Sequence, residues 1–140
     1  MKKVLSTILL VSGLNLFANN LITISDTKDI CKNSLYSIQK GKVNKAFNDV
    51  KKFWPLPPAE IDNVAYQTKV QLDMVSKRFG NAIGIDFIRT KEAGKSFLEH
   101  TYILKYENTS IRYICTFYKP SDKWLINSIR WDDKTSLLFE

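Results

Sequence analysis

The chain has 140 residues, of which 44% are hydrophobic and 25% are charged. This composition excludes an intrinsically disordered chain, and the length is that of a single domain with an ample core of its own. The formal net charge is +7, and it falls to +5 when residues 1–18, which hold two lysines and no acidic residue, are left out.

Residues 1–18 have the layout of a secretory signal peptide. Lys2 and Lys3 precede an apolar run, and Ala18 supplies a small residue at the expected cleavage point. A membrane-spanning helix needs about 20 mainly apolar residues, whereas polar residues interrupt this run. We therefore predict export and cleavage near Ala18, with an uncleaved anchor as the alternative. A chain rich in Lys, Asn and Ile is typical of a bacterial source, so the predicted location is the periplasm.

Export makes the two cysteines informative. Cys31 and Cys115 would lie in an oxidising compartment, where a pair of cysteines persists as a disulfide. We predict a bond between them, and the alternative is two separate buried thiols that act as small hydrophobic side chains.

Three helices are expected after the signal segment. The first covers residues 27–39 and is capped by Ser25 or Asp26; the second covers residues 42–53. The third opens at Pro57-Pro58 and reaches Phe79, because proline suits the first turn of a helix. Each has an apolar stripe at helical spacing.

Four strands follow, over residues 83–90, 96–106, 110–118 and 123–132, rich in β-branched and aromatic residues. Alternation puts Ile83, Ile85 and Phe87 on one face of the first strand, and it separates Ile129 and Trp131 from Ile126 in the last. The predicted fold is α+β: a curved four-stranded antiparallel sheet with the helices on one face. The tail Leu137-Leu138-Phe139 is expected to cover part of the other face.

Two segments resemble the nuclear transport factor 2-like superfamily, whose members form a cystatin-like cone. Gly41-Lys42-Val43-Asn44-Lys45-Ala46-Phe47 resembles that group's entry into its second helix. Phe117-Tyr118-Lys119, followed by Lys123-Trp124-Leu125-Ile126-Asn127-Ser128-Ile129, resembles its closing strand pair. The resemblance covers nearly all of residues 19–140. It implies a bent sheet around a long helix and either pocket chemistry, as in isomerases, dehydratases and hydrolases, or binding alone. None of the catalytic constellations of those enzymes can be placed on this sequence.

The candidate site residues are aromatic or titratable. His100, the only histidine, and Tyr102 share a strand face and would supply an acid or base, with Asp86 as an alternative base. A structural role for each is the competing interpretation. One histidine and two distant cysteines make no recognisable metal-ligand set, and no cofactor is expected. The side chains predicted to line a ligand pocket are Trp54, Tyr66, His100, Tyr102, Tyr113 and Trp131.

These residues lead to a first hypothesis and two alternatives. The first hypothesis is an exported, non-enzymatic domain that binds a small apolar ligand or an envelope protein. The alternatives are a small isomerase- or hydrolase-type enzyme that uses His100 or Asp86 with a tyrosine, and a homodimer formed through an aromatic sheet face that includes Trp131. Lys40 and the lysines of the second helix form a basic patch, which is a solvated helix face or a site for an anionic partner. Export argues against nucleic acid, and the signal segment is the only expected membrane contact.

Overall fold

The computed structural model describes residues 20–140. The predicted signal segment and its cleavage point therefore lie outside the described residues. Within residues 20–140, no helix is both long and apolar enough to cross a membrane. The helical elements are α1 (Ile24–Gln39), α2 (Val43–Val50), a 3₁₀ turn η1 (Lys51–Phe53), α3 (Pro58–Phe79) and a last 3₁₀ turn η2 (Thr135–Phe139). The strands are β1 (Ala82–Ala93), β2 (Phe97–Tyr106), β3 (Ser110–Tyr118) and β4 (Leu125–Asp132).

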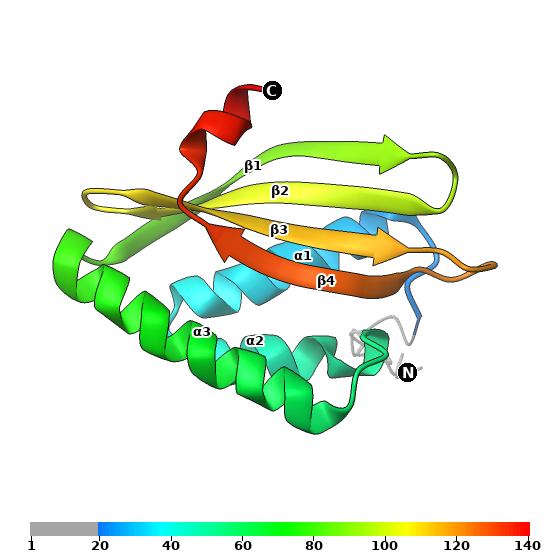
Figure 1. Cartoon of the computed structure of the whole chain (residues 1–140), viewed down its shortest axis with the longest axis horizontal. Helices are drawn as coiled ribbons and strands as arrows, with labels where there is room; N and C mark the ends of the chain where they lie inside the picture. Colours follow the sequence, from blue (N-terminus) through cyan, green and yellow to red (C-terminus); the bar gives the residue numbers. More distant parts are fainter. Residues whose placement is uncertain (1–19) are drawn as a thin grey trace, which may run out of the picture.

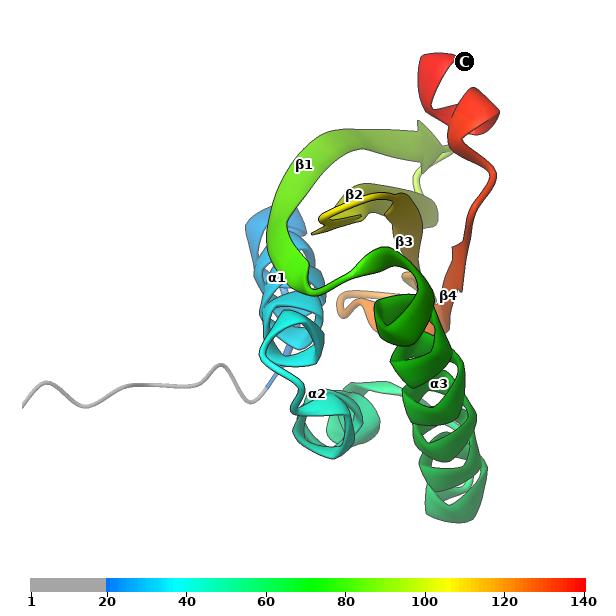
Figure 2. The same cartoon turned by 90° about the vertical axis from the view of Figure 1, so that its left-hand side faces the viewer.

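The predicted α+β class is confirmed, because three helices pack on a four-stranded antiparallel sheet in the order β1-β2-β3-β4 (Figure 1). The sheet is strongly curved, and β1 bends over one end of it (Figure 2). Helix α1 lies on the inner face of the sheet against β1, β2 and β3, while α2 packs between α1 and α3. The core is formed by the inner face of the sheet and the apolar stripes of the three helices.

Helix α1 begins three residues earlier than the sequence indicates, and its cap is neither Ser25 nor Asp26. Thr23 is the N-cap, and its hydroxyl oxygen accepts a hydrogen bond from the backbone N–H of Asp26 at 3.0 Å. In return, the Asp26 carboxylate accepts from the backbone N–H of Thr23 at 2.8 Å. This reciprocal capping box satisfies amide groups that the first helical turn leaves unpaired.

The link from α3 to β1 requires glycine at position 80, where φ is +90° and ψ is −169°, a conformation that L-residues rarely adopt. A Cβ at this position would lie 2.9 Å from the Cβ of Glu107. The Glu107 carboxylate is held there because it accepts from the backbone N–H of Asn81 at 2.8 Å.

We expect Gly80→Ala to lower the free energy of unfolding by about 2 kcal/mol, because it adds backbone strain and a clash with Glu107. Gly41→Ala is the matched control: φ at Gly41 is +76°, but its Cβ would meet nothing within 4 Å. It should lose only about 1 kcal/mol, from backbone strain alone. Urea unfolding of both variants measures the difference, and equal losses would show that the contact with Glu107 is unimportant.

Two strands depart from simple alternation. Register shifts between Ala82 and Gly84 and between Phe87 and Arg89 interrupt β1. The prediction that Ile83, Ile85 and Phe87 share a face is therefore wrong for Ile83, which is 59% exposed. Ile85 and Phe87 stay on the inner face, opposite Leu104 and Tyr102 of β2; the pairs are Ile85–Leu104 and Phe87–Tyr102.

The irregularity in β1 leaves Ile83 exposed, whereas a bulge at Asn127 in β4 turns side chains toward the core. Phe117 pairs with Ile126, but Cys115 pairs with Ile129, so both isoleucines face the core. The extra residue also turns Trp131 inward, where it is half-buried and its indole N–H points at the Thr68 hydroxyl at 3.4 Å. The prediction that Ile126 lies on the opposite face from Ile129 and Trp131 is therefore wrong.

The C-terminal turn η2 lies near β3 on the outer side of the sheet (Figure 1). The Arg89 guanidinium donates to the backbone carbonyls of Leu137 and Leu138, both at 2.7 Å. Leu137 and Leu138 are half-buried, whereas Phe139 is 91% exposed. The tail therefore covers part of the outer face, as the sequence indicates, but Phe139 takes no part in the cover.

Candidate functional site

The six predicted pocket residues do not line one cavity. His100, Tyr102 and Tyr113 meet on the inner face of the sheet, where α1 covers them. Trp54 is buried after η1, whereas Tyr66 is 67% exposed on the far side of α3. Two hollows among the described residues, of about 730 Å³ and about 290 Å³, are lined by none of the six.

His100 is fully buried, and both ring nitrogens have partners. Nε2 lies 2.8 Å from the hydroxyl oxygen of Thr27 on α1, and Nδ1 lies 2.7 Å from that of Thr90 on β1. The Thr27 hydroxyl already donates to the Ile24 carbonyl at 2.6 Å, so it accepts from an Nε2–H, and Thr90 donates to Nδ1. Burial, with a smaller effect from Lys28, lowers the pKa of His100 to about 4. The ring is therefore neutral at physiological pH and tied to the fold.

Cys31 and Cys115 form a disulfide beside this histidine, since Cys115 is the cross-strand partner of His100. One turn further along α1, the Ser34 hydroxyl donates to the Cys31 carbonyl at 2.8 Å and lies 2.9 Å from the Tyr113 hydroxyl. Burial raises the pKa of Tyr113, which stays protonated and donates to Ser34.

Helix α1 is thus joined to the sheet at three successive positions of one face: Thr27, Cys31 and Ser34. Their spacing of four and three residues places them in line. A covalent bond lies in the middle, with a hydrogen bond from a sheet side chain on each side. Burial also raises the pKa of Tyr102 to about 12, and its hydroxyl lies 3.4 Å from the Lys28 carbonyl. These predicted site residues anchor α1.

Asp86 is not part of this cluster. It pairs with Ile103, which lies on the outer face of the sheet, and its carboxylate is 3.6 Å from the Lys105 ammonium. His100 belongs to the inner face. The two alternative bases of the predicted enzyme therefore lie on opposite faces of the sheet.

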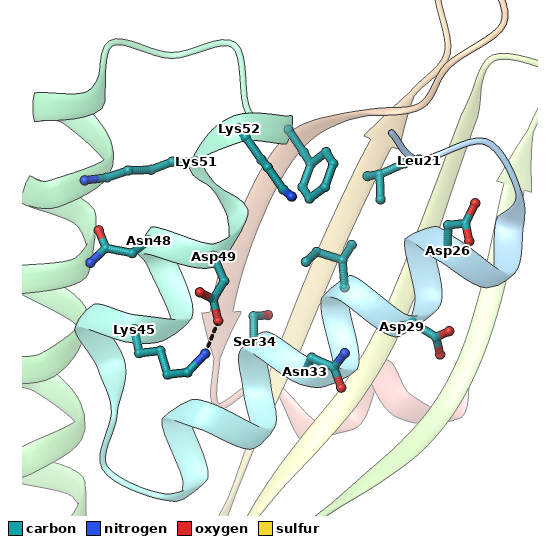
Figure 3. A pocket seen from close by; sticks show the side chains of 12 residues that line it. Leu21, Asp26, Asp29, Asn33, Ser34, Lys45, Asn48, Asp49, Lys51 and Lys52 are labelled. Carbon is teal, nitrogen blue, oxygen red and sulfur yellow. Dashed lines mark hydrogen bonds and ion pairs between the residues drawn. The ribbon is translucent and has the colours of Figure 1, made fainter. Parts of the chain in front are cut away.

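The larger hollow is a groove of about 730 Å³ between α1 and the segment formed by α2 and η1 (Figure 3). One wall is the side of α1 next to its anchoring face, and the opposite wall carries the polar side of α2. Leu21, Ile30 and Phe53 supply its apolar surface. The full lining is Leu21, Asp26, Asp29, Ile30, Asn33, Ser34, Lys45, Asn48, Asp49, Lys51, Lys52 and Phe53.

The two walls of the groove carry different charge. Asp26 and Asp29 lie at the outer edge of α1, with side chains that point away from α2, whereas the three lysines lie on the α2–η1 side with Asp49 (Figure 3). Asp26 is occupied by the capping box, whose hydrogen bonds lower its pKa. Among the described residues, neither Asp29 nor Lys52 takes part in an ion pair. One carboxylate and one ammonium without an ion-pair partner therefore lie on the two sides of the groove, and the Lys52 ammonium lies over the Phe53 ring, 4.9 Å from its centroid.

The predicted basic patch is divided by ion pairs. Lys45 pairs with Asp49 one turn further along α2, and Lys51 pairs with Asp62 of α3. Lys51 points toward α3 in Figure 3. Lys40 and Lys42, before α2, do not line the groove. The lysines thus belong to separate local environments, and only part of the patch faces the groove.

This groove was not predicted from the sequence. Its walls are polar positions of two helices, such as Asn33 and Asn48, and these look like ordinary solvated faces in a sequence. The available signal was the small number of apolar residues on the sides of the two helices that line the groove, where Asn33, Lys45 and Asn48 stand instead.

Among the described residues, no group of three or more His, Cys, Asp or Glu side chains is placed to hold a metal ion. Comparison of the chain with protein-family models, with curated proteins and with solved structures found no match. The resemblance to the nuclear transport factor 2-like superfamily stays a prediction from the sequence, and the groove is the candidate site on its geometry alone.

Proposed function

We propose that this chain is an exported, non-enzymatic domain of the bacterial periplasm that binds a segment of an envelope protein in the groove between α1 and α2–η1. The observation that carries the proposal is a groove with apolar surface that has a carboxylate, Asp29, at its α1 edge and an ammonium, Lys52, on its η1 side, neither of them in an ion pair among the described residues. A peptide that presents an apolar side chain between a basic and an acidic one matches this arrangement.

The volume and lining of the groove favour a polypeptide over a small apolar molecule. Small-molecule sites of similar volume bury most of the surface of their ligand, whereas this groove is open to solvent along one side and has many polar or charged residues at its edges. The aromatic side chains that would form an apolar pocket, Tyr102 and Tyr113, are buried against α1.

Signal-peptide features and two cysteines support the periplasmic location.

A role as a binding domain also agrees with the state of the titratable groups. A general base needs a pKa near the operating pH and access to a substrate, but His100 is buried, has both nitrogens hydrogen-bonded and has a pKa of about 4. Asp86 lies on the outer face of the sheet beside Lys105. We therefore favour binding over the isomerase or hydrolase alternative.

The proposal is tested in cells by placing a photo-crosslinking amino acid at Asn33 or Asn48, one on each wall of the groove. Both positions are exposed, so the fold tolerates the change. We expect the same discrete adduct from both positions. It should decrease at least about fivefold when Asp29→Lys and Lys52→Glu are introduced, because two charge contacts are reversed.

The same amino acid at Asn127, which is exposed on the β4 bulge, is the matched control and should give no such adduct. Equal adducts from Asn127, or adducts unaffected by the charge reversals, would contradict binding in the groove. Native mass spectrometry tests the remaining alternative, a small apolar ligand. A small molecule that is bound to the native protein and released on denaturation would support that hypothesis.

A further inference from the structure

Helix α3 carries a row of exposed apolar side chains on the side away from the core. Tyr66, Val70 and Met74 are 67%, 43% and 59% exposed. They recur every four residues and so lie one above another. The opposite side of the helix buries Ile61, Ala65, Thr68 and Leu72.

This row is not needed for the fold of one chain. In Figure 2, α3 forms the edge of the molecule on the side away from α1, and its outer face points to solvent. A solvent-facing helix surface is normally polar throughout. Apolar residues gathered in one row on such a surface mark an interaction site more often than isolated ones do.

The charges at the two ends of α3 identify the partner. Glu60 lies in the first turn, and Lys77 and Arg78 lie in the last. Glu60 and Arg78 are separated by 18 residues, or five complete turns, so they project from the same flank of the helix. Neither takes part in an ion pair among the described residues.

A second copy of the same helix, running in the opposite direction, matches this layout. Val70 lies near the middle of Pro58–Phe79, so an antiparallel copy places Val70 against Val70 and Tyr66 against Met74 at two symmetric points. A methionine sulfur at an aromatic ring is a favourable contact. The same arrangement brings each Glu60 to the Arg78 of the other copy, whereas a parallel one would oppose like charges.

We propose that the chain forms a two-fold symmetric homodimer through the outer faces of two antiparallel α3 helices. The predicted dimer through the sheet used a different surface, and its residue Trp131 packs inward against Thr68. The outer face of the sheet instead carries the ion pairs Arg112–Asp132 and Glu99–Arg130. The α3 dimer leaves the groove beside α1 open, so it is independent of what the groove binds.

The interface is of modest size. A helix of 22 residues is about 33 Å long, and the apolar row occupies its middle. Contact areas of this kind are typical of weak, reversible dimers. We expect the protein to be monomeric when dilute and dimeric when concentrated.

Sedimentation velocity of the mature chain over a concentration series tests the proposal. Val70→Glu places two carboxylates against each other at the symmetry axis and should weaken dimerisation about a hundredfold or more. Met74→Glu, which removes the contact with Tyr66, should also give a monomer. Asn44→Glu adds the same charge at an exposed position of α2 and should leave the dimer unchanged.

A charge exchange tests the antiparallel arrangement. Glu60→Arg alone and Arg78→Glu alone should each weaken the dimer about tenfold, since each turns two attractive pairs into repulsive ones. Combining them should restore the original affinity. Urea unfolding of each variant confirms that the fold is intact.

A monomer at all concentrations would overturn the proposal. A dimer that survives Val70→Glu would also overturn it and would move the interface to another surface. If Val70→Glu abolishes the dimer but the combined exchange fails to restore what the single changes lost, the antiparallel arrangement is wrong.

Discussion

Reduction of the Cys31–Cys115 disulfide should lower the free energy of unfolding by about 4 kcal/mol, the chain-entropy value for a bond across a large sequence separation. The bond joins residues 84 positions apart and ties the first helix to the third strand. Without it the unfolded chain gains conformational freedom, and α1 stays attached through the hydrogen bonds of Thr27 and Ser34 and its packing. Because the free energy of unfolding of a small domain is only about 5–15 kcal/mol, this bond contributes a large part of it.

Urea unfolding with and without a reducing agent measures this loss. The variant Cys31→Ala/Cys115→Ala is the matched control, because it should be destabilised by a similar amount and should not respond to the reductant. A denatured mass two hydrogens below that of the reduced chain establishes that the bond is present at the start. A loss below about 1 kcal/mol would show that the hydrogen bonds and packing around α1 hold the helix without the disulfide.

Local sequence signals were sufficient for most of the fold. Prolines and glycines set the limits of α3, which begins at Pro58 and ends before Gly80. Strand β3 has the bounds that its β-branched and aromatic residues indicate. Such elements are determined by neighbouring residues, so a single sequence contains the information needed to find them.

Features that depend on distant residues were not predictable in the same way. The bulge at Asn127 exists because β4 must match both β3 and the core, and simple alternation therefore gave the wrong face for Ile126 relative to Trp131. The N-cap at Thr23 was missed because Ser25 and Asp26 are equally suitable by residue type.

The candidate site was less predictable than the fold. The prediction that His100 and Tyr102 share a strand face is confirmed, and Tyr113 joins them as the cross-strand partner of Tyr102, but the sequence contained no information on what covers that face. Their partners Thr27 and Ser34 are 73 and 79 residues away in the sequence. An aromatic and histidine-containing strand face looks the same in a sequence whether it lines a pocket or anchors a helix. Only the packing of α1 separates the two.

His100 should make the protein less stable in acid, well before the carboxylates are protonated. Its pKa is about 4 in the folded state, compared with an ordinary value of 6.5. Between these values the unfolded chain binds more protons than the folded one, so the stability is complete above pH 6.5 and declines as the pH falls toward 4. The integrated loss is about 3 kcal/mol, from the value of one pKa unit. Urea unfolding as a function of pH measures the decline.

The variant His100→Gln isolates this contribution, because glutamine does not titrate. At neutral pH the variant should be about 2 kcal/mol less stable, since one side-chain amide cannot reproduce both bonds to Thr27 and Thr90. Near pH 4 the difference should vanish or reverse. Hydrogen bonds lower the pKa of Asp26 and Asp132. The stability that these two carboxylates contribute is therefore lost only in stronger acid, and the loss is equal in the wild type and the variant. A difference independent of pH would mean that the folded protein accepts a proton on His100 without cost, and that Thr90 rotates to accept the new Nδ1–H.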